Sequence, residues 1–249
     1  MQFIQGLPQG VMVGQTRIHH EKAQATANET LQGFNLALHV QDDAARVQQH
    51  RMQLLQDFSK WNVDKITWMN QTHSTTCHRV ENEICFQALE GDGLVTTTRR
   101  HALMMMTADC LPVVLGNHEG NEVANLHAGW RGLAGGIIEN TIAAMQTKPT
   151  WAWLGAAISQ DCFEIGAEVK LAFCDKYPAL EIAFKAGEKA GKYYADLYAI
   201  AGFILKEHGV QTVLGGDQCS YKQADEYFSY RREARTGRMA TFVFMTDQC

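Results

Sequence analysis

The 249-residue chain has little net charge and no run of basic residues. Its formal net charge is −5 at pH 7, whereas nucleic acids and anionic lipids are bound by clustered Lys and Arg side chains. The chain also lacks a run of about 18 uncharged apolar residues, the length that a membrane-spanning helix needs. We therefore expect a small-molecule partner, with no nucleic acid and no membrane; the oligomeric state is left open.

The sequence also lacks the marks of a secreted protein. Its seven cysteines are an odd number scattered along a long chain, whereas disulfide-rich secreted domains are short and dense in cysteine. The first residues, MQFIQGLPQGVMVGQ, contain no basic segment followed by an apolar one, which is the pattern of a secretory leader. We expect reduced thiols and a cytoplasmic protein.

Few features divide the chain. It has four prolines and neither a Gly/Ser-rich linker nor an internal repeat, so we expect one domain over residues 1–249. Apolar residues at helical spacing predict helices within 42–58, 132–146 and 195–210. Short apolar runs predict buried strands within 65–73, 101–116 and 122–130. Because helices and strands alternate, the pattern favours a mixed α/β architecture.

Three residues that carry chemistry lie at or near the ends of predicted strands: His73 in NQTHS, Cys110 in TADCLP and His127 in NLHAGWRG. A thiolate and two imidazoles suit zinc, and three protein ligands leave a fourth position open for water or substrate. The spacing alone is a weak signal, because no CxxC or HExxH motif fixes the geometry locally. Taken alone, each residue is better explained by a structural role, and Cys110 by a buried inert thiol; the functional interpretation needs all three together.

Three other stretches could have either a structural or a ligand-binding role. The glycine-rich HAGWRGLAGG would present backbone N–H groups to an anion, or form only a tight strand-to-helix turn. The triplet Met104, Met105 and Met106 is typical of core packing rather than of copper binding. The stretch FSYRREARTGR carries four arginines, which would form either a solvated surface or a clamp for phosphate or carboxylate.

A family resemblance is carried by eight blocks in order along the chain: FNLALHVQDD (34–43), WMNQTH (68–73), GDGLVT (91–96), TADCLPVVL (107–115), HAGWRGLAGG (127–136), WLGAAISQDCFEIG (153–166), GGDQCS (215–220) and FSYRREARTGRMA (228–240). Together they resemble the YfiH-like family. That family carries a polyphenol oxidase or laccase-domain label and is also described as zinc-dependent purine nucleoside phosphorylase and adenosine deaminase. A peptidoglycan-editing role has been proposed for it in bacteria.

The resemblance implies a single α/β domain with mixed sheets between helical layers, similar to Cys–His toxin deamidases. It places the metal ligands, which are also the catalytic residues, on His73, Cys110 and His127, with zinc as the metal. It assigns substrate or phosphate contacts to Arg17, Asn35, Gln71 and Arg231. A carboxylate, Asp92 or Asp109, would orient a liganding imidazole or shuttle a proton.

Two blocks depart from the family pattern. Where the family has a glycine-rich R-x-G-G-V-S stretch, this chain reads TRIHHEKAQATANE at residues 16–29. The family's L-G-P-A-I-G appears as LGAAIS, with Ala156 and Ser159 in place of Pro and Gly. We expect the loop at 15–30 to differ in shape and to affect substrate selectivity, whereas all three presumed ligands are present.

The functional prediction is a zinc-dependent purine nucleoside phosphorylase acting on adenosine, inosine and methylthioadenosine, with adenosine deaminase activity. None of the ten histidines forms an H-x-H pair, which argues against copper and a multicopper oxidase. Alternatives are a metal-free hydrolase or deamidase with a Cys110–His127 pair, and a peptidoglycan-precursor editing enzyme. An interaction module with structural zinc would need a fourth ligand, for which Cys77 and His78 are candidates.

Overall fold

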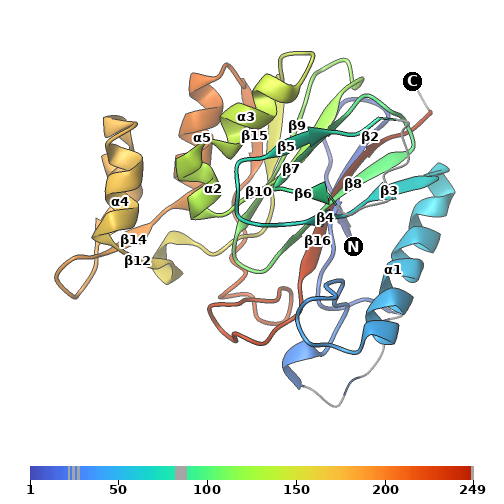
Figure 1. The fold of residues 1–249 in the computed structure, drawn as a ribbon, viewed down its shortest axis with the longest axis horizontal. Coiled ribbons are helices and arrows are strands. Elements are labelled where there is room, and N and C mark those ends of the chain that lie inside the picture. Colours follow the sequence, from blue (N-terminus) through green and yellow to red (C-terminus); the bar gives the residue numbers. More distant parts are fainter. Residues whose placement is uncertain (22, 24–25, 27–28, 82–88, 248–249) are drawn as a thin grey trace.

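Two β-sheets lie face to face between helices in the computed structural model (Figure 1), which describes residues 1–249 except 22, 24–25, 27–28, 82–88 and 248–249. The five-stranded sheet has the order β1 (Gln2–Phe3), β2 (Val11–Gln15), β16 (Met239–Met245), β8 (His101–Thr107) and β3 (Lys65–Thr67). The six-stranded sheet has the order β15 (Thr212–Gly215), β11 (Trp151–Leu154), β9 (Leu111–Gly116), β10 (Val123–Ala128), β7 (Gly93–Thr96) and β5 (Cys77–Arg79). Both sheets are mixed, with parallel pairs β3–β8, β11–β15 and β5–β7.

Alternation along the central strands explains this layering. On β8, Leu103 and Met105 face the core between the two sheets, whereas Ala102 and Met104 face the core beneath helix α1 (Ala44–Phe58). Such a strand is buried on both faces and therefore reads as a continuous apolar run. The methionine triplet is thus core, as the sequence indicated, and each of its members is at most 8% exposed.

Helices cover the two outer faces. Helix α1 packs on the five-stranded sheet, and its N-cap Asp43 accepts hydrogen bonds from the backbone N–H groups of Ala45 and Arg46. Figure 1 shows α2, α3 and α5 on the opposite side of the molecule, against the six-stranded sheet. Their bounds are Trp130–Gly135, Ile137–Ala144 and Leu197–Glu207. The mixed α/β fold with sheets between helical layers is confirmed.

The predicted helix at 132–146 is two helices. Gly136 has a φ of 102°, a left-handed conformation that ends α2 before α3 begins. The predicted strand region at 101–116 is likewise two strands, β8 and β9, which belong to different sheets. The chain passes from one sheet to the other at residues 108–110, so Cys110 lies at the junction of the two sheets.

Smaller elements complete the fold. A three-stranded sheet consists of β12 (Glu164–Gly166), β14 (Lys192–Ala195) and β13 (Phe184–Ala186), next to α4 (Ala167–Cys174). Strands β4 (Met69–Asn70) and β6 (Leu89–Glu90) pair in parallel. Short 3-10 helices span Glu29–Leu31, Ser59–Trp61, Gln160–Cys162 and Pro178–Ala183. No helix among the described residues is long and apolar enough to cross a membrane, and a cytoplasmic location stays a prediction.

Candidate metal centre

His73, Cys110 and His127 come together although they lie far apart in the sequence. One donor atom from each lies within 4.8 Å of the other two. The Sγ atom of Cys110 is 3.9 Å from Nε2 of His73, and the two imidazole rings meet edge to face with centroids 4.7 Å apart. Among the residues that the structure describes, this is the one group of three or more such donors.

His127 is fixed by the sheet and by Asp92. It lies near the end of β10, and its side chain is almost fully buried. Its Nδ1–H donates to Oδ1 of Asp92 over 2.7 Å, while its backbone N–H donates to the Asp92 carbonyl over 2.8 Å. With Nδ1 bound to a carboxylate, the Nε2 lone pair is the one left for a ligand.

The second carboxylate oxygen of Asp92 binds the turn that carries His73. Oδ2 accepts from the backbone N–H of Ser74 over 2.6 Å and from its hydroxyl over 2.8 Å, and also from Thr72. Burial alone would raise the pKa of Asp92, but the His127 and Ser74 hydrogen bonds lower it to about 2. One ionised carboxylate therefore holds both histidine-bearing segments.

Asp109, the other candidate carboxylate, serves a different purpose. Its Oδ1 accepts from the Ser220 hydroxyl over 2.7 Å, and its Oδ2 accepts from the backbone N–H of Arg231 over 2.6 Å. Its φ of 91° is left-handed, a conformation that Asp tolerates better than most residues. Asp109 thus connects the Cys110 turn to the 220–231 loop, and the hydrogen bonds of its carboxylate go to that loop rather than to either imidazole.

His73 is held from both sides. It has a left-handed φ of 58°, and backbone strain of this kind persists where surrounding contacts impose it. Two residues before it, the Gln71 amide exchanges two hydrogen bonds with the backbone of Met106 on β8, of 2.8 and 2.7 Å. On the other side, a Cβ at Gly129 would lie 3.0 Å from the Cys110 sulfur and 3.3 Å from the His73 ring, so glycine there allows the close approach.

The thiol and the buried imidazole influence each other's ionisation. Burial would raise the pKa of Cys110, but the adjacent His127 and His73 lower it below its usual value. Burial would lower the pKa of His127, but the Cys110 sulfur and the Asp92 carboxylate raise it. The arrangement therefore favours a Cys110 thiolate, the form that binds metals and attacks electrophiles.

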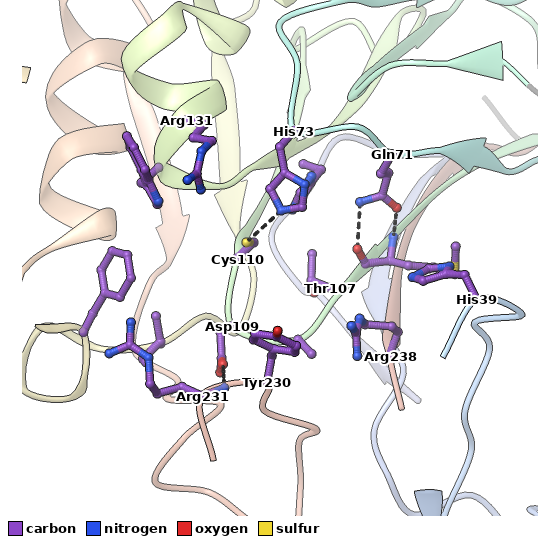
Figure 2. Close-up of a pocket in the computed structure, with 16 residues that line it drawn as sticks. His39, Gln71, His73, Thr107, Asp109, Cys110, Arg131, Tyr230, Arg231 and Arg238 are labelled. Atoms are coloured by element: carbon purple, nitrogen blue, oxygen red, sulfur yellow. Dashed lines mark hydrogen bonds between the residues drawn. The ribbon is translucent and has the colours of Figure 1, made fainter. Parts of the chain in front are cut away.

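The donors open into a pocket of about 430 Å³, a volume suited to a small molecule. Figure 2 shows Cys110 and His73 in its middle, with Arg131 and Arg231 on one side and Gln71, His39 and Arg238 on the other. The sequence had pointed to Arg238 only as one of the four arginines of FSYRREARTGR, and it gave no separate role to these other lining residues: His39, Trp130, Arg131, Phe163 and Tyr230. All of these residues stand inside the blocks that carry the family resemblance, and that membership was the available signal for them.

Of the four expected substrate contacts, the structure places Gln71 and Arg231 in the pocket lining. Arg17 lies outside it, in an ion pair with Glu226 and a 2.7 Å hydrogen bond to Gln2. Asn35 is fully buried, and its amide is bonded to Ala37, Asp42 and the backbone N–H of Arg238. Both placements argue against direct substrate contact, because neither side chain reaches the pocket.

Cys77 and His78, the candidate fourth ligands, do not join the three donors. Cys77, the first residue of β5, packs against the hydrophobic core, and burial raises the pKa of its thiol to about 11. The His78 Nε2 forms a hydrogen bond with the Glu90 carbonyl over 2.8 Å. Neither belongs to the donor group, so a closed four-ligand site formed with them is not supported.

The donor set fits a metal ion. A thiolate and two imidazoles are borderline-soft ligands, and the Asp92–His127 pair is the carboxylate–histidine arrangement common at zinc sites. These donors line an open pocket that leaves room for a substrate atom. A metal held here by His73, Cys110 and His127 would act as a Lewis acid; the choice between zinc and copper stays a prediction.

Comparison with known proteins shows the family. Residues 17–246 match the family described as multi-copper polyphenol oxidoreductase laccase, and the chain belongs to this family. A protein of Shigella flexneri named purine nucleoside phosphorylase YfiH is 38% identical over 215 residues, 85% of this chain and 86% of that protein. A Haemophilus influenzae protein named purine nucleoside phosphorylase is 37% identical, over 85% of this chain and 86% of its own.

Solved structures show the same fold. A Neisseria meningitidis protein of the DUF152 family is 40% identical and superimposes with a TM-score of 0.87, covering 96% of each chain. The Bacillus licheniformis hypothetical protein YfiH is 26% identical with a TM-score of 0.83, covering 95% of this chain and 93% of its own. The resemblance drawn from the sequence blocks is confirmed.

Proposed function

We propose that this protein is a metal-dependent purine nucleoside phosphorylase that acts on adenosine, inosine and methylthioadenosine, with zinc as the metal. The observation that carries the proposal is the His73, Cys110 and His127 group in the middle of an arginine-lined pocket. It is supported by relatives that are named purine nucleoside phosphorylases. Phosphate is an anion and a purine is a flat ring, and the pocket offers a surface for each.

The flat surface lies on one side of the metal centre. The Arg131 guanidinium lies over the Trp130 ring, 4.3 Å from its centroid, and Arg231 lies over Phe163 at 5.3 Å. The Arg231 guanidinium also donates to the carbonyls of Cys162 and Glu164 at 3.3 Å, which fixes its plane. Aromatic and guanidinium planes stack on nucleobases without requiring one particular base.

In the proposed reaction a phosphate oxygen forms a bond to the anomeric carbon of the ribose, and the bond from that carbon to the purine nitrogen breaks. The electron pair of the broken bond leaves with the base, which takes up a proton. The products are free purine and the sugar 1-phosphate, which is ribose 1-phosphate for adenosine and inosine. A bound metal supplies Lewis-acid stabilisation. Asp92 keeps His127 oriented through Nδ1, and an arginine of the pocket lining that does not stack on the base would offset the charge of the phosphate.

Adenosine deamination is the second activity that we propose for this site. Water adds to C6 of adenosine and ammonia leaves, which gives inosine, a reaction that zinc sites with a Cys/His ligand set support in nucleobase deaminases. It needs no phosphate. The two activities therefore separate experimentally by the phosphate requirement.

A metal-free cysteine enzyme is the second candidate, favoured by the lowered pKa of Cys110 beside the His127–Asp92 pair. In that reaction the thiolate would bond to a carboxamide carbon, and ammonia would leave with a proton from His127. Water would then hydrolyse the thioester and regenerate the thiol. No step of this mechanism requires His73.

The test incubates the purified protein with adenosine, inosine or methylthioadenosine, with and without inorganic phosphate, and quantifies base, sugar phosphate and ammonia. We expect free base and sugar 1-phosphate in equal amounts, only with phosphate: ribose 1-phosphate from adenosine and inosine, and methylthioribose 1-phosphate from methylthioadenosine. Without phosphate we expect inosine plus ammonia from adenosine. The Cys110→Ala protein is the control for a contaminating phosphorylase. Absence of phosphate-dependent base release from all three nucleosides would refute the phosphorylase proposal.

A further inference from the structure

We propose that Arg238 and His39 form a binding subsite for inorganic phosphate at the end of the pocket opposite Arg131 and Arg231. This inference rests on the proposed phosphorolysis and names the residues that would receive its second substrate. Both side chains line the pocket, and Figure 2 shows them together on one side of Cys110.

Arg238 brings a positive charge that no carboxylate of the described chain neutralises by an ion pair. Its Nη1 donates to the carbonyls of Thr236 and Gly237 over 2.8 and 3.0 Å, which fixes the guanidinium. By contrast, Arg17 is paired with Glu226.

The described pocket lining contains one carboxylate, Asp109. Its Oδ1 accepts a hydrogen bond from Ser220 and its Oδ2 accepts one from Arg231. A half-buried guanidinium without such a partner favours an anion.

His39 adds a second nitrogen donor from a different segment of the chain. It follows the buried 34–37 stretch, is itself exposed, and lines the pocket. An imidazole N–H and a guanidinium supply donors from two directions, which suits the several oxygens of a phosphate.

Asn35 explains how two distant segments form one subsite. Its Oδ1 accepts the backbone N–H of Arg238 and that of Ala37, each over 3.0 Å. Its Nδ2 donates to Asp42 over 2.8 Å. The buried amide therefore joins the loop that carries His39 to the residue that precedes strand β16. We assign Asn35 as a positioning residue for the subsite, rather than as a substrate contact.

A displacement at the anomeric carbon requires the pocket to bind phosphate and purine at two separate positions. Phosphate and the departing purine must lie on opposite sides of the anomeric carbon for an in-line displacement. The arm with Arg131 and Arg231 holds the stacked planes suited to the base, and the arm with Arg238 and His39 lies on the other side of Cys110. Phosphate at Arg238 thus places the ribose beside the metal centre.

The experiment measures binding of inorganic phosphate by calorimetry to the protein as isolated, and the KM values for phosphate and for inosine. For Arg238→Gln we expect phosphate affinity to fall by about ten-fold or more, since a charge-assisted hydrogen bond is lost. The phosphate KM should rise in parallel and the inosine KM should change by less than about two-fold. His39→Ala should lower phosphate affinity by a smaller factor in the same direction.

Two variants serve as matched controls. Arg235→Gln removes a charge from the same segment, but this exposed residue lies outside the pocket lining and donates to the Gln41 carbonyl; phosphate affinity should be unchanged. Arg131→Gln removes a charge from the other arm, and it should raise the inosine KM rather than the phosphate KM. If Arg238→Gln does not fold, as judged by thermal melting, Arg238→Lys and His39→Ala carry the test.

The two levels of the proposal fail in different ways. In one outcome, base release needs phosphate, but Arg238→Gln and His39→Ala bind phosphate as tightly as wild type. This result would overturn the subsite and leave the phosphorylase proposal intact. In another outcome, wild type binds phosphate and Arg238→Gln does not, but no nucleoside gives base release. This result would support the anion subsite and refute the phosphorylase proposal. Equal loss of phosphate affinity in Arg235→Gln would also overturn the subsite, because a general charge effect would then explain the result.

Discussion

Two buried histidines, His127 and His101, differ in the direction in which their surroundings shift the imidazole pKa. His127 lies near the end of β10 and His101 at the start of β8, and both side chains are almost fully buried. His127 donates to Asp92 and contacts Cys110, which raise its pKa although burial opposes this. His101 forms a hydrogen bond with the Thr67 hydroxyl through Nε2 at 2.7 Å, and its Nδ1 has no hydrogen-bond partner among the described residues.

The environment of His101 therefore favours the neutral ring. Burial lowers the pKa of His101 to about 4, with a smaller contribution in the same direction from Lys65, against Glu81 and Asp64. The comparison teaches that burial alone does not mark a functional histidine. The charged partners decide whether a buried imidazole carries a proton, and a carboxylate on one nitrogen leaves the other nitrogen for chemistry.

The variants with the largest expected effect on this comparison remove one of the metal-binding side chains beside His127. If the three donors bind zinc, Cys110→Ala and His73→Ala should each lose the metal and the activity together, by more than about 100-fold. Elemental analysis should find about one zinc per wild-type chain and little copper. His101→Gln, at the other buried histidine, should keep the metal.

Chelation separates this mechanism from the metal-free thiolate. Stripping the metal should silence the enzyme, and added zinc should restore it. An active, metal-free His73→Ala protein would contradict the metal centre and favour the cysteine nucleophile, whose steps do not use His73. Several coppers per chain would instead favour the oxidase chemistry in the family's description.

The next largest effect is expected from a variant that removes the carboxylate partner of His127, because His101 has no such partner among its described hydrogen bonds. Asp92→Asn keeps the size of the side chain but replaces the carboxylate that accepts from His127, Ser74 and Thr72. Loss of such a carboxylate partner typically costs 10- to 100-fold in metal affinity or activity. A competition titration with a zinc chelator measures this, and Asp109→Asn is the comparison that should leave His127 unaffected. Equal metal affinity in Asp92→Asn and wild type would refute the assigned role of Asp92.

Sequence reasoning predicted the three donors and named Asp92 and Asp109 as candidate supporting carboxylates, but it could not choose between the two. Asp109 stands next to Cys110 in the sequence, yet its left-handed backbone turns the carboxylate toward Ser220 and Arg231. Asp92 lies 35 positions from His127 and reaches it only because β7 pairs with β10. A single sequence does not encode which strands pair, so the choice between the two carboxylates needed the three-dimensional structure.

The elements show the same limit. Apolar spacing predicted the helix at 42–58 and the helix within 195–210, and both are confirmed. It could not show that one apolar run at 101–116 would divide between two sheets, because both halves are buried and read alike. Asn35 was expected to contact substrate since it stands in a family block, whereas its amide holds the Arg238 backbone.

A third effect concerns the pH dependence of stability at His101. Because the folded pKa of His101 is about 4 and that of an unfolded histidine is about 6.5, the unfolded state takes up the proton first as pH falls. The stabilising contribution is complete above about pH 6.5 and is lost progressively toward pH 4, by about 3 kcal/mol. Urea unfolding of wild type and His101→Gln between pH 7 and 4 measures it. The variant should have a flatter profile, and identical slopes would contradict the lowered pKa.

The smallest effect comes from crowding the metal centre without removing a donor. Gly129→Ala would place a methyl group 3.0 Å from the Cys110 sulfur and 3.3 Å from the His73 ring, so both side chains must shift by a few tenths of an ångström. We expect zinc affinity to fall by only a few-fold, since the methyl group displaces two donors slightly and removes none of them. Gly202→Ala is the matched control, because nothing lies within 4 Å of its added Cβ. Wild-type zinc affinity in Gly129→Ala would show that the donors adapt, and that the short approach at Gly129 is not required for the site.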